Sequence, residues 1–277
     1  MQRCNVTRSF LAALLIACNG IAASGHALAY ETGPVPTLSS IQADGPFAVS
    51  LQTVSGSGFG GGTVYSPNTV GKYAVVAVCP GFTATQSSIA AISRRLATHG
   101  FVVVTINTNS IYDYPPSRAN QLLAALRTVT ALTTGPVAGK MDISRQGVAG
   151  WSMGGGGAML AAGMTPGLKG GVAFAPWAQS TNVRTSAVPM AYLAGTADGV
   201  APASSHASVF YNATPLTTKK MLGVIQGADH NFPKTASQPA SYTQVAWMKR
   251  FLDSDTRYSQ FLKGDSRFAT YRSTGPF

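Results

Sequence analysis

The 277-residue sequence predicts an α/β protein, a single domain with a mostly parallel central sheet flanked by helices. Short apolar runs rich in β-branched residues recur along the chain, as is typical of strands buried on both faces. Segments with helical spacing of apolar residues lie between these runs, and such alternation favours parallel pairing. Neither a linker after residue 45 nor an internal repeat divides the sequence, so we expect one domain.

The composition supports a folded protein with a substantial core. Hydrophobic residues make up 45% of the sequence and charged residues only 10%, which excludes a disordered chain and a coiled coil. Lys and Arg number 20 against 9 Asp and Glu, for a formal net charge of +11. No run of five basic residues, zinc-ligand spacing or RNA-binding aromatic motif accompanies this charge, so we expect no nucleic-acid partner. We favour a diffuse positive surface that adsorbs to weakly negative material.

The expected elements follow in order from the pattern. Residues 46–66 alternate apolar and polar side chains around a Gly/Ser-rich turn, which predicts antiparallel strands. Residues 87–100 have helical spacing, a serine start and a glycine stop. The other expected strands are 73–80, 101–109, 145–152, 168–177, 189–196 and 219–227, and the other expected helices are 118–132, 153–164, 203–213 and 241–255.

The N-terminus predicts a signal peptide at residues 1–29, followed by a catalytic domain at residues 30–277. Two arginines precede a short apolar run, and Ala27-Leu28-Ala29 has the small-x-small form cleaved by signal peptidase. We therefore expect a secreted protein whose first mature residue is Tyr30. The alternative is a lipobox ending at Cys18, which would anchor the protein through a lipid on that cysteine.

The cysteines and the hydropathy add two expectations. Removal of the leader takes Cys4 and Cys18 and leaves Cys79 alone, so no disulfide can form within the mature chain. Cys79 lies in a wholly apolar run, which favours a buried structural side chain over a nucleophile. No apolar run after the leader is long enough to span a membrane, and we expect none in the mature chain.

The stretch GWSMGGGG, residues 150–157, carries the main functional signal. Gly150-x-Ser152-x-Gly154 lies between an expected strand and an expected helix, which is the arrangement of a nucleophile elbow. The glycines two residues before and after the serine leave room for a turn that larger side chains would block. No lysine follows the glycines, which argues against a phosphate-binding P-loop.

A serine nucleophile needs a base and an acid. In the α/β-hydrolase order of serine, acid and histidine, only His230 has the right position, just after an expected strand. His99 lies at a helix end and His206 in a helical stretch, where a surface or wall position suits it better. Between Ser152 and His230 the carboxylates are Asp198 and Asp229. Asp198 lies on the right kind of loop, whereas Asp229 directly precedes the histidine and suits a turn.

The tetrahedral intermediate of acyl transfer needs two donors for its oxyanion. One is the backbone N–H of Met153, the residue after the serine, and the other comes from the loop after the strand at residues 73–80. Proline has no N–H to donate, which leaves Gly81 or Phe82, and we favour Phe82.

Five segments together resemble the bacterial cutinases and poly(ethylene terephthalate) hydrolases, the PETases. They are CPGFTATQSS, HGFVVVTINTNS, GWSMGGGG, APW and VAWMKRFLDSDTRYSQF, and the resemblance runs through nearly all of the mature chain. It implies the α/β-hydrolase fold, and an aromatic acyl group held against the tryptophan of APW, Trp177. Carried over residue by residue, it implies Ser152, Asp198 and His230 as the triad, Phe82 and Met153 at the oxyanion hole, and Trp177, Phe82, His206, Phe210 and Asn231 as substrate contacts.

The sequence departs from that family at several positions. Phe82 stands where tyrosine is usual, and His206 with Phe210 resembles the actinobacterial cutinases more than the PETase with smaller residues there. The family's C-terminal disulfide is missing, because Lys263 and Gly275 stand where cysteines are expected. We expect a frayed C-terminus and a stability lower by about 2–4 kcal/mol than in disulfide-bearing relatives.

These observations together predict a secreted serine hydrolase that cleaves polyesters, such as cutin or poly(ethylene terephthalate), and short-chain esters. The substrate is a polymeric or small ester, no cofactor or metal is expected, and we expect a monomer. One alternative is a general triacylglycerol lipase or carboxylesterase. A second is a non-catalytic binding protein of the same fold, which the presence of all three triad residues disfavours.

Overall fold

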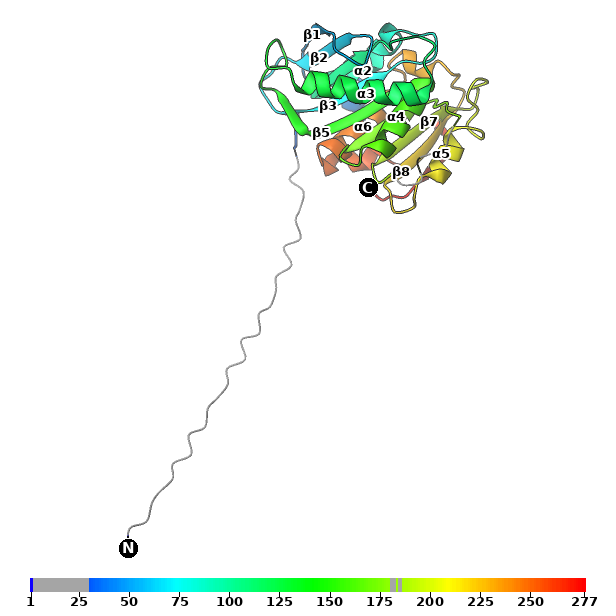
Figure 1. Cartoon of the computed structure of the whole chain (residues 1–277). Coiled ribbons are helices and arrows are strands. Elements are labelled where there is room, and N and C mark those ends of the chain that lie inside the picture. Colours follow the sequence, from blue (N-terminus) through cyan, green and yellow to red (C-terminus); the bar gives the residue numbers. More distant parts are fainter. Residues whose placement is uncertain (2–29, 180–182, 184–185) are drawn as a thin grey trace.

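A computed structural model describes residues 1, 30–179, 183 and 186–277. The chain forms one nine-stranded sheet in the order β1-β2-β4-β3-β5-β6-β7-β8-β9. The strands from β4 to β8 in this order run parallel, while β1, β2 and β9 pair antiparallel. Helices lie in front of and behind the sheet (Figure 1), which confirms the predicted α/β class with a mostly parallel central sheet.

The predicted strands and helices are present with bounds close to those expected, whereas α1 and β9 were not predicted. The strands are β1 (Val49–Val54), β2 (Gly62–Pro67), β3 (Tyr73–Cys79), β4 (Phe101–Ile106), β5 (Met141–Trp151), β6 (Gly170–Phe174), β7 (Met190–Gly195), β8 (Lys220–Ile225) and β9 (Phe268–Ser273). The α-helices are α1 (Leu38–Gln42), α2 (Ala90–Thr98), α3 (Pro115–Thr130), α4 (Met153–Met164), α5 (Ala207–Ala213) and α6 (Ala240–Leu252). Short 3₁₀ helices cover Gln86–Ile89, Phe232–Lys234 and Thr256–Phe261.

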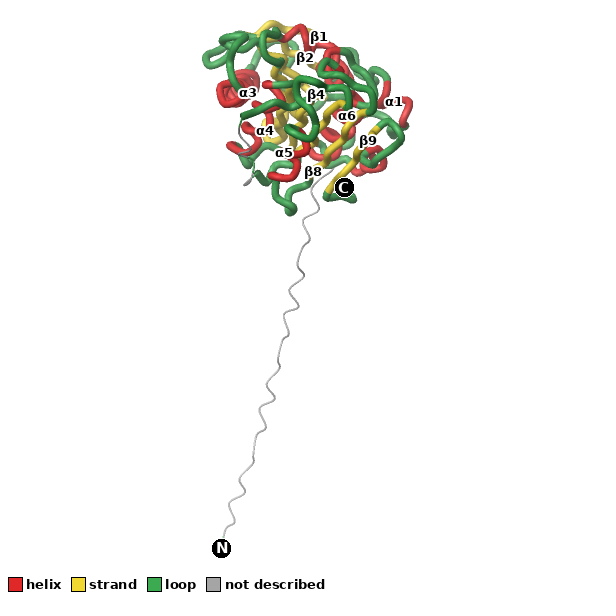
Figure 2. The backbone as a smooth tube through the Cα atoms, turned by 90° about the vertical axis from the view of Figure 1, so that its right-hand side faces the viewer, coloured by secondary structure: helices red, strands yellow, loops and turns green. Residues whose placement is uncertain are grey.

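The core is two apolar layers, one on each face of the sheet. Helices α3, α4 and α5 cover one face, and α1, α2 and α6 cover the other. Figure 2 shows the sheet between these two groups of helices. Strands β3, β4 and β6 are buried at every position, because both of their faces lie under helices. This accounts for the continuous apolar runs in the sequence.

The C-terminus is where the sequence prediction was wrong. Instead of a frayed end, residues 268–273 form β9, which pairs antiparallel with β8 and which the sequence pattern did not reveal. The last residue, Phe277, packs edge-on against Trp247 at 5.1 Å and against Phe251 at 5.6 Å between ring centroids. Strand pairing and aromatic packing hold this end in place, and the sequence has no cysteine after Cys79 that could form a disulfide here.

His206 and His99 both lie at helix ends. His206 does not lie inside a helix, because α5 begins only at Ala207 and His206 is its N-cap residue. His99 is the C-cap of α2, as expected. The predicted signal peptide and the alternative lipid-bearing Cys18 lie outside the described residues, apart from Met1.

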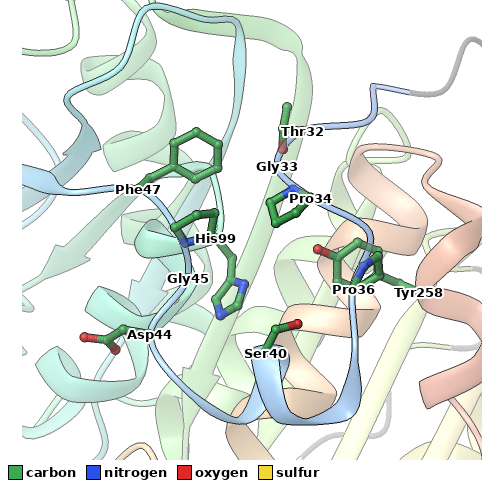
Figure 3. A pocket seen from close by; sticks show the side chains of 11 residues that line it. Thr32, Gly33, Pro34, Pro36, Ser40, Asp44, Gly45, Phe47, His99 and Tyr258 are labelled. Atoms are coloured by element: carbon green, nitrogen blue, oxygen red, sulfur yellow. The ribbon is translucent and has the colours of Figure 1, made fainter.

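Residues 32–47 cross one side of the molecule and leave a pocket of about 220 Å³ beneath them. Figure 3 shows the rings of Phe47 and Pro34 on opposite sides of this pocket, with the His99 ring between them. His99 is 4% exposed, and its Nε2 lies 3.1 Å from the carbonyl oxygen of Ala43. Burial lowers the pKa of His99 to about 4, so the ring is neutral at neutral pH. His99 thus ties the N-terminal segment to α2.

This burial predicts a pH-dependent stability. The pKa of His99 in the fold, about 4, lies below its ordinary value of 6.5, so the unfolded chain takes up the proton first as pH falls. The contribution of the neutral His99 ring to the free energy of unfolding is complete above about pH 6.5. It is lost as the pH falls towards 4, by up to about 3 kcal/mol. Denaturant unfolding of the parent and of His99→Gln between pH 7 and pH 4 measures it. The variant should lose less stability on acidification, and equal losses would contradict the assignment.

Candidate active site

The serine of GWSMGGGG lies at a sharp turn between β5 and α4. Ser152 has φ +57° and ψ −122°, a strained backbone conformation for a residue with a side chain. Its N–H donates to the carbonyl of Phe174 at 2.9 Å, and its own carbonyl accepts from Gly156 at 2.9 Å and Trp177 at 3.0 Å. These hydrogen bonds on both sides of the residue hold the turn in place. The predicted strand–serine–helix elbow is therefore present.

The two glycines of the elbow are required by close backbone approach. A Cβ atom on Gly150 would lie 2.2 Å from the carbonyl oxygen of Gly154. A Cβ on Gly154 would lie 2.2 Å from the carbonyl oxygen of Cys79 and 2.3 Å from that of Pro80, at the end of β3. Any larger residue would therefore push α4 away from the sheet.

The next three glycines serve different neighbours. A Cβ on Gly155 would lie 3.1 Å from the carbonyl oxygen of Phe174 in β6, whereas one on Gly156 would lie 2.2 Å from that of Trp177. A Cβ on Gly157 would lie 2.9 Å from the Cβ of Arg118 in α3. The glycine run thus lets α4 approach a strand, a loop and a neighbouring helix.

This packing predicts the effect of a single methyl group. Gly154→Ala should destabilise the fold by about 3 kcal/mol, because the added Cβ meets backbone atoms that cannot rotate away. The matched control is Gly167→Ala, where no atom lies within 4 Å of the new Cβ and stability should stay within about 0.5 kcal/mol. Urea unfolding measures both variants. Similar urea midpoints of unfolding for the two variants would contradict the close approach of α4 to the end of β3.

The structure brings Ser152, His230 and Asp198 together in one hydrogen-bonded series. His230 Nε2 lies 2.9 Å from Ser152 Oγ, and His230 Nδ1 lies 2.8 Å from Asp198 Oδ2. The serine follows β5, the aspartate follows β7 and the histidine follows β8, all at the carboxyl edge of the parallel sheet. Ser152 is 6% exposed and the Asp198 side chain is fully buried. A shielded base can thus accept the proton of the serine hydroxyl.

Asp198 is held as a carboxylate. Burial alone would raise its pKa, but hydrogen bonds from His230 and from the backbone N–H groups of Ala201 and Val200 outweigh burial and lower it. The ionised oxygen facing Nδ1 fixes the imidazole tautomer that leaves Nε2 free to take a proton. The competing acid, Asp229, is exposed and accepts from the backbone N–H of Asn231 at 2.9 Å, as a turn residue does.

The loop after β3 lies directly against the elbow. A Cβ on Gly81 would lie 3.1 Å from the Cβ of Ser152. Phe82 follows in this loop, and Thr83 has a positive φ of 56° while its N–H donates to Ile111 at 2.8 Å. Met153 begins α4, where an N–H has no acceptor within its own helix. The N–H groups of Phe82 and Met153 are thus the candidates for an oxyanion hole.

A buried arginine that the sequence analysis missed braces this loop. Arg118 of α3 is 0% exposed, and its guanidinium donates to the carbonyls of Pro80 at 3.1 Å, Ile111 at 2.9 Å and Asp113 at 2.6 Å. Its hydrogen bonds join the loop after β3 to the loop after β4. In sequence, Arg118 looked like an ordinary first-turn helix residue, and no pattern indicated its partners.

Trp151 provides a second brace that the sequence did not reveal. Its indole N–H donates to the carbonyl oxygen of His230 at 2.7 Å, and the two rings lie 5.6 Å apart. The Nζ of Lys234 lies 4.8 Å above the indole ring. Trp151 directly precedes the serine, so one strand end orients both the serine and the histidine.

Three of the five predicted substrate contacts form a connected aromatic series. Trp177 is half-buried, lies 6.0 Å from His206, and His206 lies 6.0 Å from Phe210 between ring centroids. Phe210 is 1% exposed and supports His206 from below rather than facing the surface. Phe82 is 40% exposed at the other side of the elbow. Asn231 is exposed beside His230.

Cys79 is fully buried and burial raises its pKa to about 11, in agreement with a structural role. Within residues 30–179, 183 and 186–277, no group of three or more His, Cys, Asp or Glu side chains is placed to hold a metal ion. Among the described helices, none has the length and apolar character needed to cross a bilayer.

The sheet order, the strained elbow and the placement of side chains at the carboxyl edge define an α/β-hydrolase. The chain belongs to the PET hydrolase-like family, whose pattern matches residues 24–274. This confirms the resemblance drawn from the sequence.

Curated relatives agree with the family. Cutinase est1 of Thermobifida alba is 43% identical over 258 residues, covering 90% of this chain and 87% of that protein. A cutinase of Thermobifida fusca (strain YX) is 42% identical over 277 residues, covering 96% and 92%. A bis(hydroxyethyl) terephthalate hydrolase of Streptomyces coelicolor is 43% identical over 239 residues, covering 84% and 76%.

Proposed function

We propose that the protein is a secreted carboxylic ester hydrolase that cleaves polyesters and short-chain esters through an acyl-enzyme. The observation that carries the proposal is the hydrogen-bonded series from Ser152 through His230 to Asp198, at 2.9 Å and 2.8 Å. The similarity to proteins named cutinase and bis(hydroxyethyl) terephthalate hydrolase supports the substrate class.

The mechanism follows from the geometry. His230 Nε2 takes the hydroxyl proton as Ser152 Oγ attacks the ester carbonyl, and Asp198 stabilises the imidazolium. The N–H groups of Phe82 and Met153 hold the oxyanion. His230 then protonates the departing alcohol, which leaves an acyl group on Ser152. Water enters, gives its proton to His230, and releases the acid and the free serine.

A polyester substrate suits the surroundings of the serine. Trp177 is half-buried and Phe82 is 40% exposed, so aromatic faces are accessible on both sides of the elbow. An aromatic acyl group would stack on such faces. The excess of basic residues would favour adsorption to a polyester surface that bears carboxylate ends. We further propose that the mature protein starts near Tyr30 and acts as a monomer, without a cofactor.

The nucleophile and acid can be tested on soluble substrate. Ser152→Ala should lower hydrolysis of a p-nitrophenyl ester by about a millionfold, to background. Asp198→Asn should lower kcat by about 10⁴, because Nδ1 then has the wrong hydrogen-bond partner. A fluorophosphonate probe should label the parent and not Ser152→Ala. Labelling that survives this substitution would place the nucleophile elsewhere, and no labelling of the parent would favour a binding protein.

The substrate class needs a separate measurement. Release of aromatic acid from amorphous poly(ethylene terephthalate) film is compared with hydrolysis of a long-chain triacylglycerol emulsion, with Ser152→Ala as the control for both. We expect hydrolysis of the film to depend on Ser152. Cleavage of the emulsion and of soluble esters with an untouched film would instead assign a lipase or carboxylesterase.

A further inference from the structure

We propose that the pocket beneath residues 32–47 (Figure 3) binds a small uncharged molecule that has one ring and one hydroxyl group, such as a phenol. Its walls come from the N-terminal segment, from His99 at the end of α2 and from the 3₁₀ helix Thr256–Phe261. His99 lies two residues before β4, at the amino edge of the parallel strands, whereas the candidate triad lies at their carboxyl edge. The pocket is therefore a second site, separate from the one proposed for ester hydrolysis.

The size and the walls of the pocket suit a single ring. Its apolar walls are the side chains of Pro34, Pro36, Pro46 and Phe47. A cavity of about 150 Å³ is enough to hold benzene, so the volume of about 220 Å³ has room for a ring with one substituent. Pro34 and Pro46 are exposed whereas Pro36 is buried, so the pocket has both an opening to solvent and an interior wall.

His99 presents a hydrogen-bond acceptor to this pocket. Its Nε2 lies 3.1 Å from the carbonyl oxygen of Ala43, and a carbonyl can only accept, so the proton of the neutral ring is on Nε2. Nδ1 is left with a lone pair and has no partner among the residues that the structure describes. His99 is 4% exposed, and a buried acceptor without a partner is costly. A ligand that donates to Nδ1 would remove this cost.

Tyr258 presents a hydrogen-bond donor to the same pocket. Its side chain is 4% exposed, and burial raises its pKa to about 12, so the hydroxyl keeps its proton. Figure 3 shows this hydroxyl pointing into the pocket from the side opposite Phe47, with the His99 ring between them. Within the described part of the chain the hydroxyl has no hydrogen-bond partner. Because a hydroxyl group both donates and accepts, one ligand hydroxyl can pair with His99 Nδ1 and with Tyr258.

The charges around the pocket favour an uncharged ligand. Asp44 is the carboxylate that lines it, and Arg94 and Arg95 hold this group at 2.6 Å and 2.7 Å. An ammonium group in the pocket would therefore find no free carboxylate there. A carboxylate group would face the lone pair of His99 Nδ1 and would lose its hydration without a cation to replace it. A neutral hydroxyl meets neither difficulty.

The test uses phenol as the probe, with anisole and benzoate as matched controls. Anisole keeps the ring and the oxygen but has no hydroxyl hydrogen to donate to His99, and benzoate carries a charge. The purified protein, labelled with ¹⁵N in its histidine side chains, is titrated at pH 7 while NMR follows the resonance of His99 Nδ1. Phenol should shift this resonance saturably, with a Kd of about 1 mM. Anisole should bind about fivefold more weakly, and benzoate should leave the resonance unchanged.

A variant removes the donor of the pocket without removing its ring. Tyr258→Phe should weaken the binding of phenol by about fivefold. The matched control is Tyr112→Phe, which removes the hydroxyl of a tyrosine that is 62% exposed and lies outside this pocket. It should leave the Kd unchanged. The spectrum of His99→Gln, which lacks one histidine, assigns the resonance, and thermal unfolding checks that each variant is folded.

Four outcomes would overturn the inference. They are a His99 resonance that phenol does not shift, which would leave a pocket filled by water only, equal Kd values for phenol and anisole, binding of benzoate as tight as that of phenol, or an unchanged Kd in Tyr258→Phe. The comparison of the three probes uses the parent protein, so it decides the matter even where a variant fails to fold. None of these measurements depends on ester hydrolysis.

Discussion

The site depends on the strained backbone of Ser152. A residue with a side chain stays at φ +57° only where its surroundings hold it there. The hydrogen bonds of its N–H and carbonyl group do so, linking β5 to the end of β6 and to the backbone of Trp177. The absence of side chains at Gly150 and Gly154 allows the same close packing. The serine hydroxyl, the start of α4 and the aromatic wall at Trp177 are thus positioned by one turn.

The second constraint is the way in which the loops at the carboxyl edge of the sheet are joined. The guanidinium of Arg118 lies among backbone carbonyls of two loops. A buried cation without acceptors would cost far more free energy than these hydrogen bonds contribute to stability. Trp151 holds the backbone of His230 in a similar way through its indole N–H. The geometry of the reacting groups therefore rests on buried polar contacts as well as on the elbow.

The fold and the three polar residues of the site could be predicted from sequence because each leaves a local signal. Gly150-x-Ser152-x-Gly154 lies between a strand and a helix, and few acids and histidines compete for the other two positions. The braces leave no such signal. Besides two nearby carbonyls, Arg118 donates to the carbonyl of Pro80, 38 residues away, and Trp151 donates to one that is 79 residues away. A carbonyl group is present at every residue, so the sequence does not indicate these partners. Strand β9 was missed because its burial pattern shows no clear alternation, and the packing of Phe277 depends on α6.

The candidate active site and the exposed aromatic side chains beside it lie on different parts of this molecule. The candidate reacting groups lie on strand ends and at the N-terminus of α4, where the backbone geometry permits little change. The exposed rings of Tyr112 and Tyr114 lie on a loop, where side chains can vary without disturbing the elbow. Because Arg118 ties this loop to the one that carries Phe82, a substitution of either exposed ring should leave the candidate oxyanion donor in place.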